Sequence, residues 1–195
     1  TEFCVDEIKM MFAFIDGFDC EDVAIFCPKI LYSHEPRTQT NECLFDSVDW
    51  AITSGTFLKL EYFRNYNKFD ESYFIDRIEY DYCLCAKDNG YRIVRYNGCY
   101  MKQTLGEVKK FLGVSFYHHS PLRNYYIFRN RIYFYLNKSV LKASSNIGYL
   151  IFGSIGQICK ILFLEPEKVQ KLYFISRALV DGYHGRYGRY FSSDS

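Results

Sequence analysis

The sequence predicts an α/β fold for residues 1–110, followed by a basic, aromatic helical extension over residues 111–195. Three observations support this prediction: apolar residues at helical spacing near the start, a short apolar run over residues 23–30, and a second strand pattern at residues 91–103. The chain has 195 residues, of which 49% are hydrophobic and 19% aromatic. This composition provides a folded core and excludes a disordered chain.

The net charge of +1 conceals two halves of opposite sign. Residues 1–110 hold 13 Lys or Arg against 19 Asp or Glu, whereas residues 111–195 hold 11 against 4. We therefore expect an acidic site in the first half and, in the second, a basic aromatic face suited to phosphate, anionic lipid or nucleic acid. The alternative is that the two halves attract each other.

The first segment, "CVDEIKMMFAFI", has the apolar spacing of an amphipathic helix, at Val5, Ile8, Met11, Phe12 and Ile15. The run "VAIFCPKI" predicts a buried strand that ends at Pro28. Residues 32–47 have no hydrophobic period and many polar turn formers, so they predict a long loop over a site.

The next segment, "VDWAITSGTFLKLEYFRNY", predicts a strand, a turn at Thr53, Ser54 and Gly55, and a helix. A small turn before a helix lets backbone N–H groups approach a ligand and favours anions at the helix start. These three residues are therefore candidate substrate-binding residues. The alternative is that glycine serves the chain geometry alone.

The stretch "YRIVRYNGCYMKQ" predicts either two strands or one bent strand around Asn97 and Gly98. Ser120 as N-cap and Pro121 at the first helical position predict a long helix to about Leu136, with helical structure after it. Residues 146–164 are apolar but contain Gln157 and Lys160, and a lysine at the centre of a spanning helix costs about 2.5 to 3.5 kcal/mol. This favours a packed or interfacial helix over a spanning one.

Eight cysteines in a chain without a signal-peptide pattern indicate reduced thiols rather than a disulfide framework. Cys83 and Cys85 are two residues apart in a predicted helix, so their side chains diverge and cannot share a metal ion. A zinc site is therefore not expected.

The stretch from Phe69 to Cys83, "FDESYFIDRIEYDYC", contains five carboxylates interleaved with aromatic residues. Asp76 and Glu79 have the spacing of a capping box, which would give both a structural role at a helix N-terminus. In that interpretation the other carboxylates, Asp70, Glu71 and Asp81, are solvated charge.

In its order of motifs the chain resembles glycosyltransferase family 2, in particular its rhamnosyltransferase branch. The matching residues fall in six places: Pro28 to Ile30; Thr53 to Gly55; Phe69 to Glu71; Phe74 to Asp76 with Glu79 and Asp81; Arg123, Tyr125, Tyr126, Arg129 and Asn130; and Asp181, Gly182, Gly185, Arg186 and Gly188. The resemblance covers nearly the whole chain. It implies the C-terminal half of a GT-A mixed sheet followed by an α-helical extension.

The resemblance also implies an inverting transfer of a sugar from a nucleotide-diphosphate donor to a glycan or lipid-linked acceptor in polysaccharide synthesis. The family's catalytic base corresponds to Glu79, with Asp76 and Asp81 beside it, and the family usually has Asp at that position. The substrate-binding residues it implies are Thr53, Ser54, Gly55, Asp70, Glu71, Arg123 and Arg129.

A divalent metal, Mg or Mn, is expected for the full-length enzyme. Gln103 is a weak candidate ligand, at a position where relatives often have His. The nucleotide-binding half and its Asp-x-Asp motif do not precede the first helix, so we expect the chain to be a fragment, inactive alone. A mixed sheet that lacks neighbouring strands also predicts self-association.

The helix "SPLRNYYIFRNRIYFYLN" combines three arginines with six aromatic residues. It is consistent with bundle packing, with an anionic membrane surface and its acceptor, or with single-stranded nucleic acid. We expect a cytoplasmic protein, peripheral on the inner face of the membrane. The alternative function is a noncatalytic binding module that uses this basic aromatic face.

Overall fold

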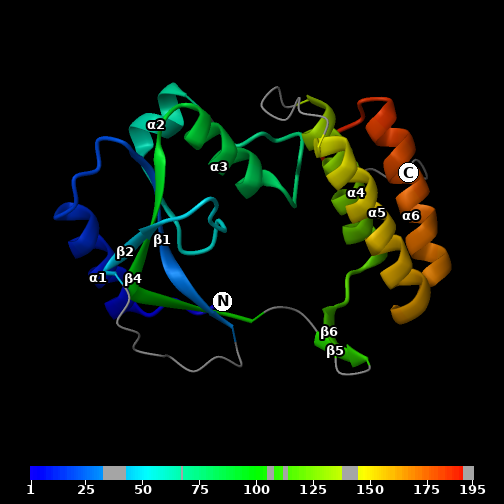
Figure 1. The fold of residues 1–195 in the computed structure, drawn as a ribbon, viewed down its shortest axis with the longest axis horizontal. Helices are drawn as coiled ribbons and strands as arrows, with labels where there is room; N and C mark the ends of the chain where they lie inside the picture. Colours follow the sequence, from blue (N-terminus) through cyan, green and yellow to red (C-terminus); the bar gives the residue numbers. More distant parts are fainter. Residues whose placement is uncertain (33–42, 67, 105–107, 112–113, 138–144, 191–195) are drawn as a thin grey trace. The chain divides into compact units, whose positions relative to one another are not determined.

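A computed structural model describes residues 1–32, 43–66, 68–104, 108–111, 114–137 and 145–190. The chain divides into two compact units, Thr1–Phe69 with Glu79–Leu105, and Asp70–Ile78 with Gly106–Ser195. Figure 1 shows the sheet of the first unit and the helices of the second. The segment 70–78 belongs to the second unit, whereas the predicted division after residue 110 assigned it to the first part. The functional labels given to the two predicted domains stay predictions.

The first unit contains a four-stranded mixed sheet with strand order β2-β4-β1-β3. The central strands β1 (Val23–Tyr32) and β4 (Arg92–Gln103) are parallel. The edge strands β2 (Phe45–Ser47) and β3 (Phe57–Leu58) pair with them in antiparallel fashion. The helices of this unit are α1 (Val5–Asp16), α2 (Leu60–Asn65) and α3 (Ile78–Asp88). The predicted α/β class is therefore confirmed.

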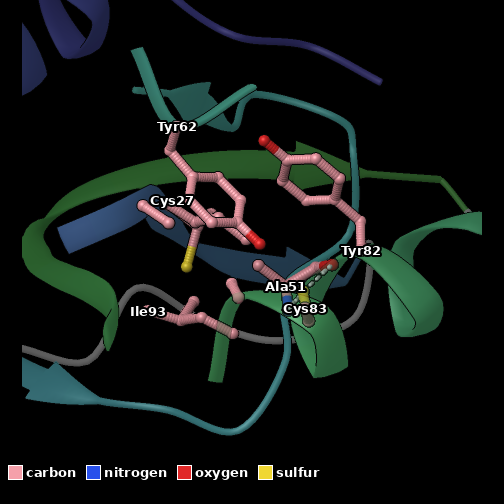
Figure 2. Packing of buried hydrophobic residues seen from close by; sticks show 9 residues of the cluster. Cys27, Ala51, Tyr62, Tyr82, Cys83 and Ile93 are labelled. Carbon is pink, nitrogen blue, oxygen red and sulfur yellow. Dashed lines mark hydrogen bonds between the residues drawn. The ribbon is translucent and has the colours of Figure 1, made fainter. Parts of the chain in front are cut away.

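Helices cover both faces of this sheet. The evidence is that successive residues of the central strands pack into two different cores. Phe26 and Val94 pack with Met11 of α1, whereas their neighbours Ile25 and Ile93 pack with residues of α2 and α3. Figure 2 shows the second of these cores, which includes Tyr62, Tyr82, Cys83 and Ile93. Burial on both faces explains why the run at β1 is continuously apolar rather than alternating.

Strand β1 continues through Pro28 to Tyr32, so the prediction that proline ends this strand is wrong. Pro28 pairs with Tyr96, but Lys29 pairs with Tyr100, so three residues of β4 bulge out between these pairs. A strand tolerates proline next to a bulge because the ladder is interrupted there. The same bulge makes β4 one bent strand rather than a hairpin, which selects one of the two predicted alternatives.

The strand predicted before Thr53 is wrong, whereas the predicted turn is confirmed, since Thr56 N donates to Thr53 O at 3.4 Å. The predicted helix is confirmed from Leu60 onwards, but Phe57 lies in a strand. Residues 48–56 are irregular, and only the two-residue strand β3 separates them from α2. Of the long loop predicted over residues 32–47, residues 33–42 lie outside the described part, and residues 45–47 form β2. Asn97 helps to hold β2 in place, because its side chain donates hydrogen bonds to Cys43 O (2.8 Å) and Asp46 Oδ2 (2.9 Å).

The second unit contains α4 (Pro121–Asn137), α5 (Ser145–Leu164) and α6 (Lys168–Tyr183). Ser120 caps α4 as predicted, since its Oγ accepts a hydrogen bond from Arg123 N at 3.2 Å. A hairpin of β5 (Val108–Phe111) and β6 (Val114–Tyr117) precedes the helices. This hairpin spans the predicted boundary at residue 110 and was not predicted.

The three long helices share one core, formed by Tyr125, Tyr126 and Phe128 of α4, Ile161 of α5, and Ile175 and Ala178 of α6. Helices α4 and α6 approach closely at Gly182, where an added Cβ would lie 3.1 Å from the Ile132 side chain. In the described part of the chain, no helix is long and apolar enough to span a membrane.

Candidate functional site

Glu79 lies in the first turn of α3 and is half-buried. It lines a cavity of about 140 Å³ in the first unit, together with Thr53, Thr56, Tyr82 and Cys83 among others. The walls of this cavity are mainly apolar. A carboxylate placed in such a hollow is suited to accept a proton from an alcohol.

Cys83 connects α3 to the irregular segment that forms part of this cavity. Its Sγ accepts a hydrogen bond from Ala51 N at 3.4 Å and lies 3.8 Å from Ala51 O (Figure 2). Burial raises the pKa of the Cys83 thiol to about 11, and the Glu79 charge contributes to this increase. The thiol is therefore neutral at physiological pH and serves as a structural link.

A larger cavity of about 540 Å³ lies in the same unit. Its walls come from the second half of β1, from residues 47–52 and from Arg95 of β4. Ala51 and Ile52 line both cavities, so the two adjoin. Trp50 lines the larger cavity, and its ring stacks on Tyr80 with a centroid distance of 5.1 Å and an angle of 16°. Tyr80 directly follows Glu79 in the first turn of α3.

The predicted turn residues have different environments. Thr53 is exposed and lines the cavity of Glu79, whereas Ser54 is half-buried. Gly55 has φ of +67°, and an added Cβ would lie 2.6 Å from Met101 Sδ. Glycine is therefore required here by backbone conformation and packing, which was the structural alternative.

Asp81 and Gln103 lie apart from this arrangement. Asp81 on α3 is only 3% exposed and is not among the residues that line the two cavities. Gln103, the weak metal candidate, is the last residue of β4 and pairs with Tyr32. Among the described residues, no group of three or more His, Cys, Asp or Glu could hold a metal ion. These residues alone do not fit a Mg or Mn site.

In the second unit, the segment 70–78 adopts an unusual backbone. Phe74, Asp76 and Arg77 have φ of 63°, 67° and 65°. A left-handed conformation costs an L-residue roughly 1–2 kcal/mol, so surrounding contacts must hold the segment in place. Asp76 cannot cap α3, because an N-cap residue is extended and directly precedes its helix, whereas Asp76 lies two residues before Ile78. The capping-box interpretation is therefore wrong.

Arg129 and Asn130 of α4 hold this segment through its carbonyl groups. Arg129 Nη2 donates to Ser72 O and Tyr73 O, both at 3.0 Å. Asn130 Nδ2 donates to Tyr73 O at 3.0 Å and Asp76 O at 3.1 Å. Both side chains have 0% exposure. Because buried donors are costly to leave unpaired, these bonds fix the strained backbone.

This geometry gives Arg129 a positioning role and does not favour the direct substrate contact predicted for it. Arg123, in contrast, is exposed, and its Nε lies 4.0 Å from Asp76 Oδ2. In the same unit, burial lowers the pKa of His119, and the charges of Arg123 and Lys160 lower this pKa further.

The other acidic residues of the segment differ in their contacts. Asp70 Oδ2 accepts a hydrogen bond from the Tyr133 hydroxyl at 2.8 Å, and Asp70 Oδ1 accepts one from Ser72 N at 3.0 Å. Glu71 is exposed. Asp70 and Glu71 were both predicted to bind substrate. Asp70 stabilises its own segment through these hydrogen bonds.

The C-terminal motif closes the same cluster. Asp181 accepts hydrogen bonds from Tyr125 Oη at 3.0 Å and from Arg186 Nη1 at 3.4 Å. Gly188 N donates to Ser72 O at 2.8 Å. Residues near positions 72, 125 and 185, far apart in the sequence, thus form one structure in the second unit.

The aromatic residues of α4 mostly form the helical core. Tyr125, Tyr126, Phe128 and Phe134 are buried. Bundle packing therefore accounts for these rings, and they leave no platform on which nucleic-acid bases could stack.

The chain is similar to a protein named dTDP-rhamnosyl transferase RfbF from Shigella flexneri. The two are 28% identical over 136 residues, which are 69% of this chain and 45% of that protein. The chain thus spans less than half the length of this relative. No protein-family model matches the chain, and no solved structure matches it. The similarity indicates a relationship to glycosyltransferases.

Sequence reasoning missed two features. Trp50 is the only tryptophan of the chain and lies in an irregular segment, which is a signal for a binding role. Lys171 is buried on α6, where its Nζ lies 2.7 Å from Glu165 Oε2 and 3.0 Å from His118 Nε2. Its spacing to Ile175 and Ala178 of the helical core could have indicated this burial.

Proposed function

We propose that this chain is the acceptor-side part of an inverting glycosyltransferase. It would transfer a sugar, such as rhamnose, from a nucleotide-diphosphate donor to a glycan or lipid-linked acceptor in cell-surface polysaccharide synthesis. The observation that carries the proposal is the position of Glu79 in a mainly apolar hollow that adjoins the larger cavity. The similarity to a dTDP-rhamnosyl transferase supports the donor class.

In the proposed reaction, Glu79 takes the proton from an acceptor hydroxyl as its oxygen attacks the anomeric carbon of the donor. The bond between that carbon and the diphosphate oxygen breaks, and the diphosphate leaves with the bonding electron pair. Attack from the face opposite the leaving group inverts the anomeric configuration. Thr53 lines the same cavity, and in this proposal its hydroxyl orients the acceptor.

The second unit, taken by itself, carries an exposed arginine that could contact a phosphate group. Arg123 is exposed beside Asp76 and is suited to contact phosphate oxygens. Arg129 and Asn130 keep Asp76 in place by bonding the backbone around it. In this proposal, a divalent metal ion would need ligands other than the residues that the structure describes.

Replacement of Glu79 by glutamine tests the proposed base. In the intact protein as the cell makes it, Glu79→Gln should lower kcat for sugar transfer by roughly 10²–10⁴-fold, since the amide cannot accept the proton. Donor binding should change little. The measurement is release of dTDP from dTDP-rhamnose together with calorimetric binding of dTDP.

Glu61→Gln on α2 is the matched control, because Glu61 is an exposed glutamate of the same unit. This variant should retain full turnover. If Glu79→Gln turns over as fast as Glu61→Gln, Glu79 is not the base and the proposal fails.

A further inference from the structure

The larger cavity of the first unit has the size of a small-molecule site. Its volume of about 540 Å³ lies within the roughly 300–1,000 Å³ that ligand pockets occupy. It lies along the second half of β1, next to its parallel neighbour β4. In open sheets with parallel strands, ligands bind near the carboxyl ends of the strands.

Trp50 and Tyr80 provide an aromatic platform at this cavity. Each ring is 45% exposed, although large aromatic side chains usually gain free energy from burial. Their near-parallel stacking, at 16°, fixes the orientation of the indole ring. The negative face of an aromatic ring attracts polarised C–H groups. A pyranose ring presents such groups on one face and hydroxyl groups around its edge.

The charged residues that line this cavity are Lys29, Asp49 and Arg95, and the positive charges of Lys29 and Arg95 both act on the Asp46 carboxylate. Arg95 of the wall lies 2.7 Å from Asp46, and Asp49 of the wall pairs with Lys87. These pairs reduce the charge available to bind an anion, and the Asp49 carboxylate repels phosphate. Carboxylate, hydroxyl and guanidinium groups can still exchange hydrogen bonds with the hydroxyl groups of a neutral ligand.

We infer that the larger cavity binds a neutral saccharide, stacked on Trp50. We assign this saccharide as the sugar acceptor, and this assignment rests on the proposed function. The shared wall at Ala51 and Ile52 then places the acceptor beside the hollow that Glu79 lines.

Intrinsic fluorescence tests binding directly, because Trp50 is the only tryptophan of the chain. Methyl α-L-rhamnopyranoside, maltose and cellobiose are titrated into the protein, with dTDP and inorganic phosphate as charged probes. At least one saccharide should change the emission of Trp50 saturably, and the charged probes should not. No saturable response to any of the saccharides, or a response to dTDP alone, would overturn the inference.

Variants at position 50 separate stacking from general burial. Binding of the responding saccharide is measured by saturation-transfer NMR. Trp50→Leu should bind it roughly tenfold more weakly, since the stacking face is lost, whereas Trp50→Phe should stay within about threefold of the unchanged protein. Tyr183→Leu, which removes an 85% exposed aromatic residue of α6, is the control and should bind normally. Equal binding by Trp50→Leu and Tyr183→Leu contradicts the role of Trp50.

Two readouts distinguish this inference from the proposed function. Glu79→Gln should retain the fluorescence response to saccharide while it loses sugar transfer. If saccharide binds at Trp50 but the intact protein transfers no sugar, the binding site stands and the transferase proposal fails. If Trp50→Leu transfers sugar with an unchanged acceptor KM, the acceptor site fails and the transferase proposal stands.

Discussion

Glu79 and Arg129 were both candidate functional residues, and the two units place them differently. In the first unit, Glu79 is half-buried and lines a cavity. In the second unit, Arg129 is fully buried and bonds backbone carbonyl groups. A charged residue near a motif can thus serve chemistry or architecture. The difference lies in whether its polar atoms face a hollow or already have partners in the protein.

The two units also differ in how they hold their other polar and charged groups. In the first unit, single contacts hold the cavity walls, such as the hydrogen bond from Ala51 N to Cys83 Sγ and the ion pair of Arg95 with Asp46. The second unit buries whole charged groups, with Lys171 and Glu165 both inaccessible to solvent. Buried charges lose hydration and depend on their partners, so we expect the second unit to be far more sensitive to loss of one polar residue.

The largest effect is expected at Lys171. Lys171→Met should lower the free energy of unfolding by about 3 kcal/mol, because the buried Glu165 carboxylate loses one cationic partner and retains Lys160, at 2.9 Å. Urea unfolding followed by circular dichroism provides the measurement. The control is Lys168→Met in the first turn of α6, where the side chain is exposed, and it should change stability by about 0.5 kcal/mol or less. Similar losses in both variants would remove the contrast between the two units.

An intermediate effect is expected at Gly55, which tests whether the turn serves packing. Gly55→Ala places a Cβ 2.6 Å from Met101 Sδ in a left-handed backbone and should cost about 2–3 kcal/mol. Gly90→Ala is the matched control, because Gly90 also has a positive φ, of 80°, but no atom near its Cβ position. It should cost only about 1 kcal/mol. Equal urea midpoints for the two variants would contradict the packing role of Gly55.

Local patterns in the sequence predicted those elements whose cause is local. The helical spacing of α1 and the Ser120–Pro121 start of α4 were both confirmed. The continuation of β1 through Pro28 was not predictable in this way, since it depends on a bulge in β4 some seventy residues later. Contacts between distant segments decided that element.

The candidate site shows the same limit. The carboxylates near Glu79 were visible in the sequence, but the left-handed backbone at Asp76 was not, because no glycine marks it. Donors on α4, more than fifty residues away, hold that backbone. The position of Trp50 beside Tyr80 likewise results from the packing of an irregular segment on α3.

At neutral pH the smallest effect is expected from the thiol link of the first unit, because this effect develops only at alkaline pH. The pKa of Cys83 is about 11 in the folded chain, against an ordinary thiol value of about 8.5. The folded state therefore prefers the neutral thiol, so this stabilisation is complete below the ordinary pKa and is lost as pH rises through about 11. In urea titrations across this range, unfolding free energy should fall more steeply with pH in the unchanged protein than in Cys83→Ala. The added slope is at most about 1.4 kcal/mol per pH unit.

Cys159→Ala, which removes an exposed thiol, is the control and should follow the unchanged protein. Parallel profiles for the unchanged protein and Cys83→Ala would show that the thiol does not support the cavity wall through its neutral form.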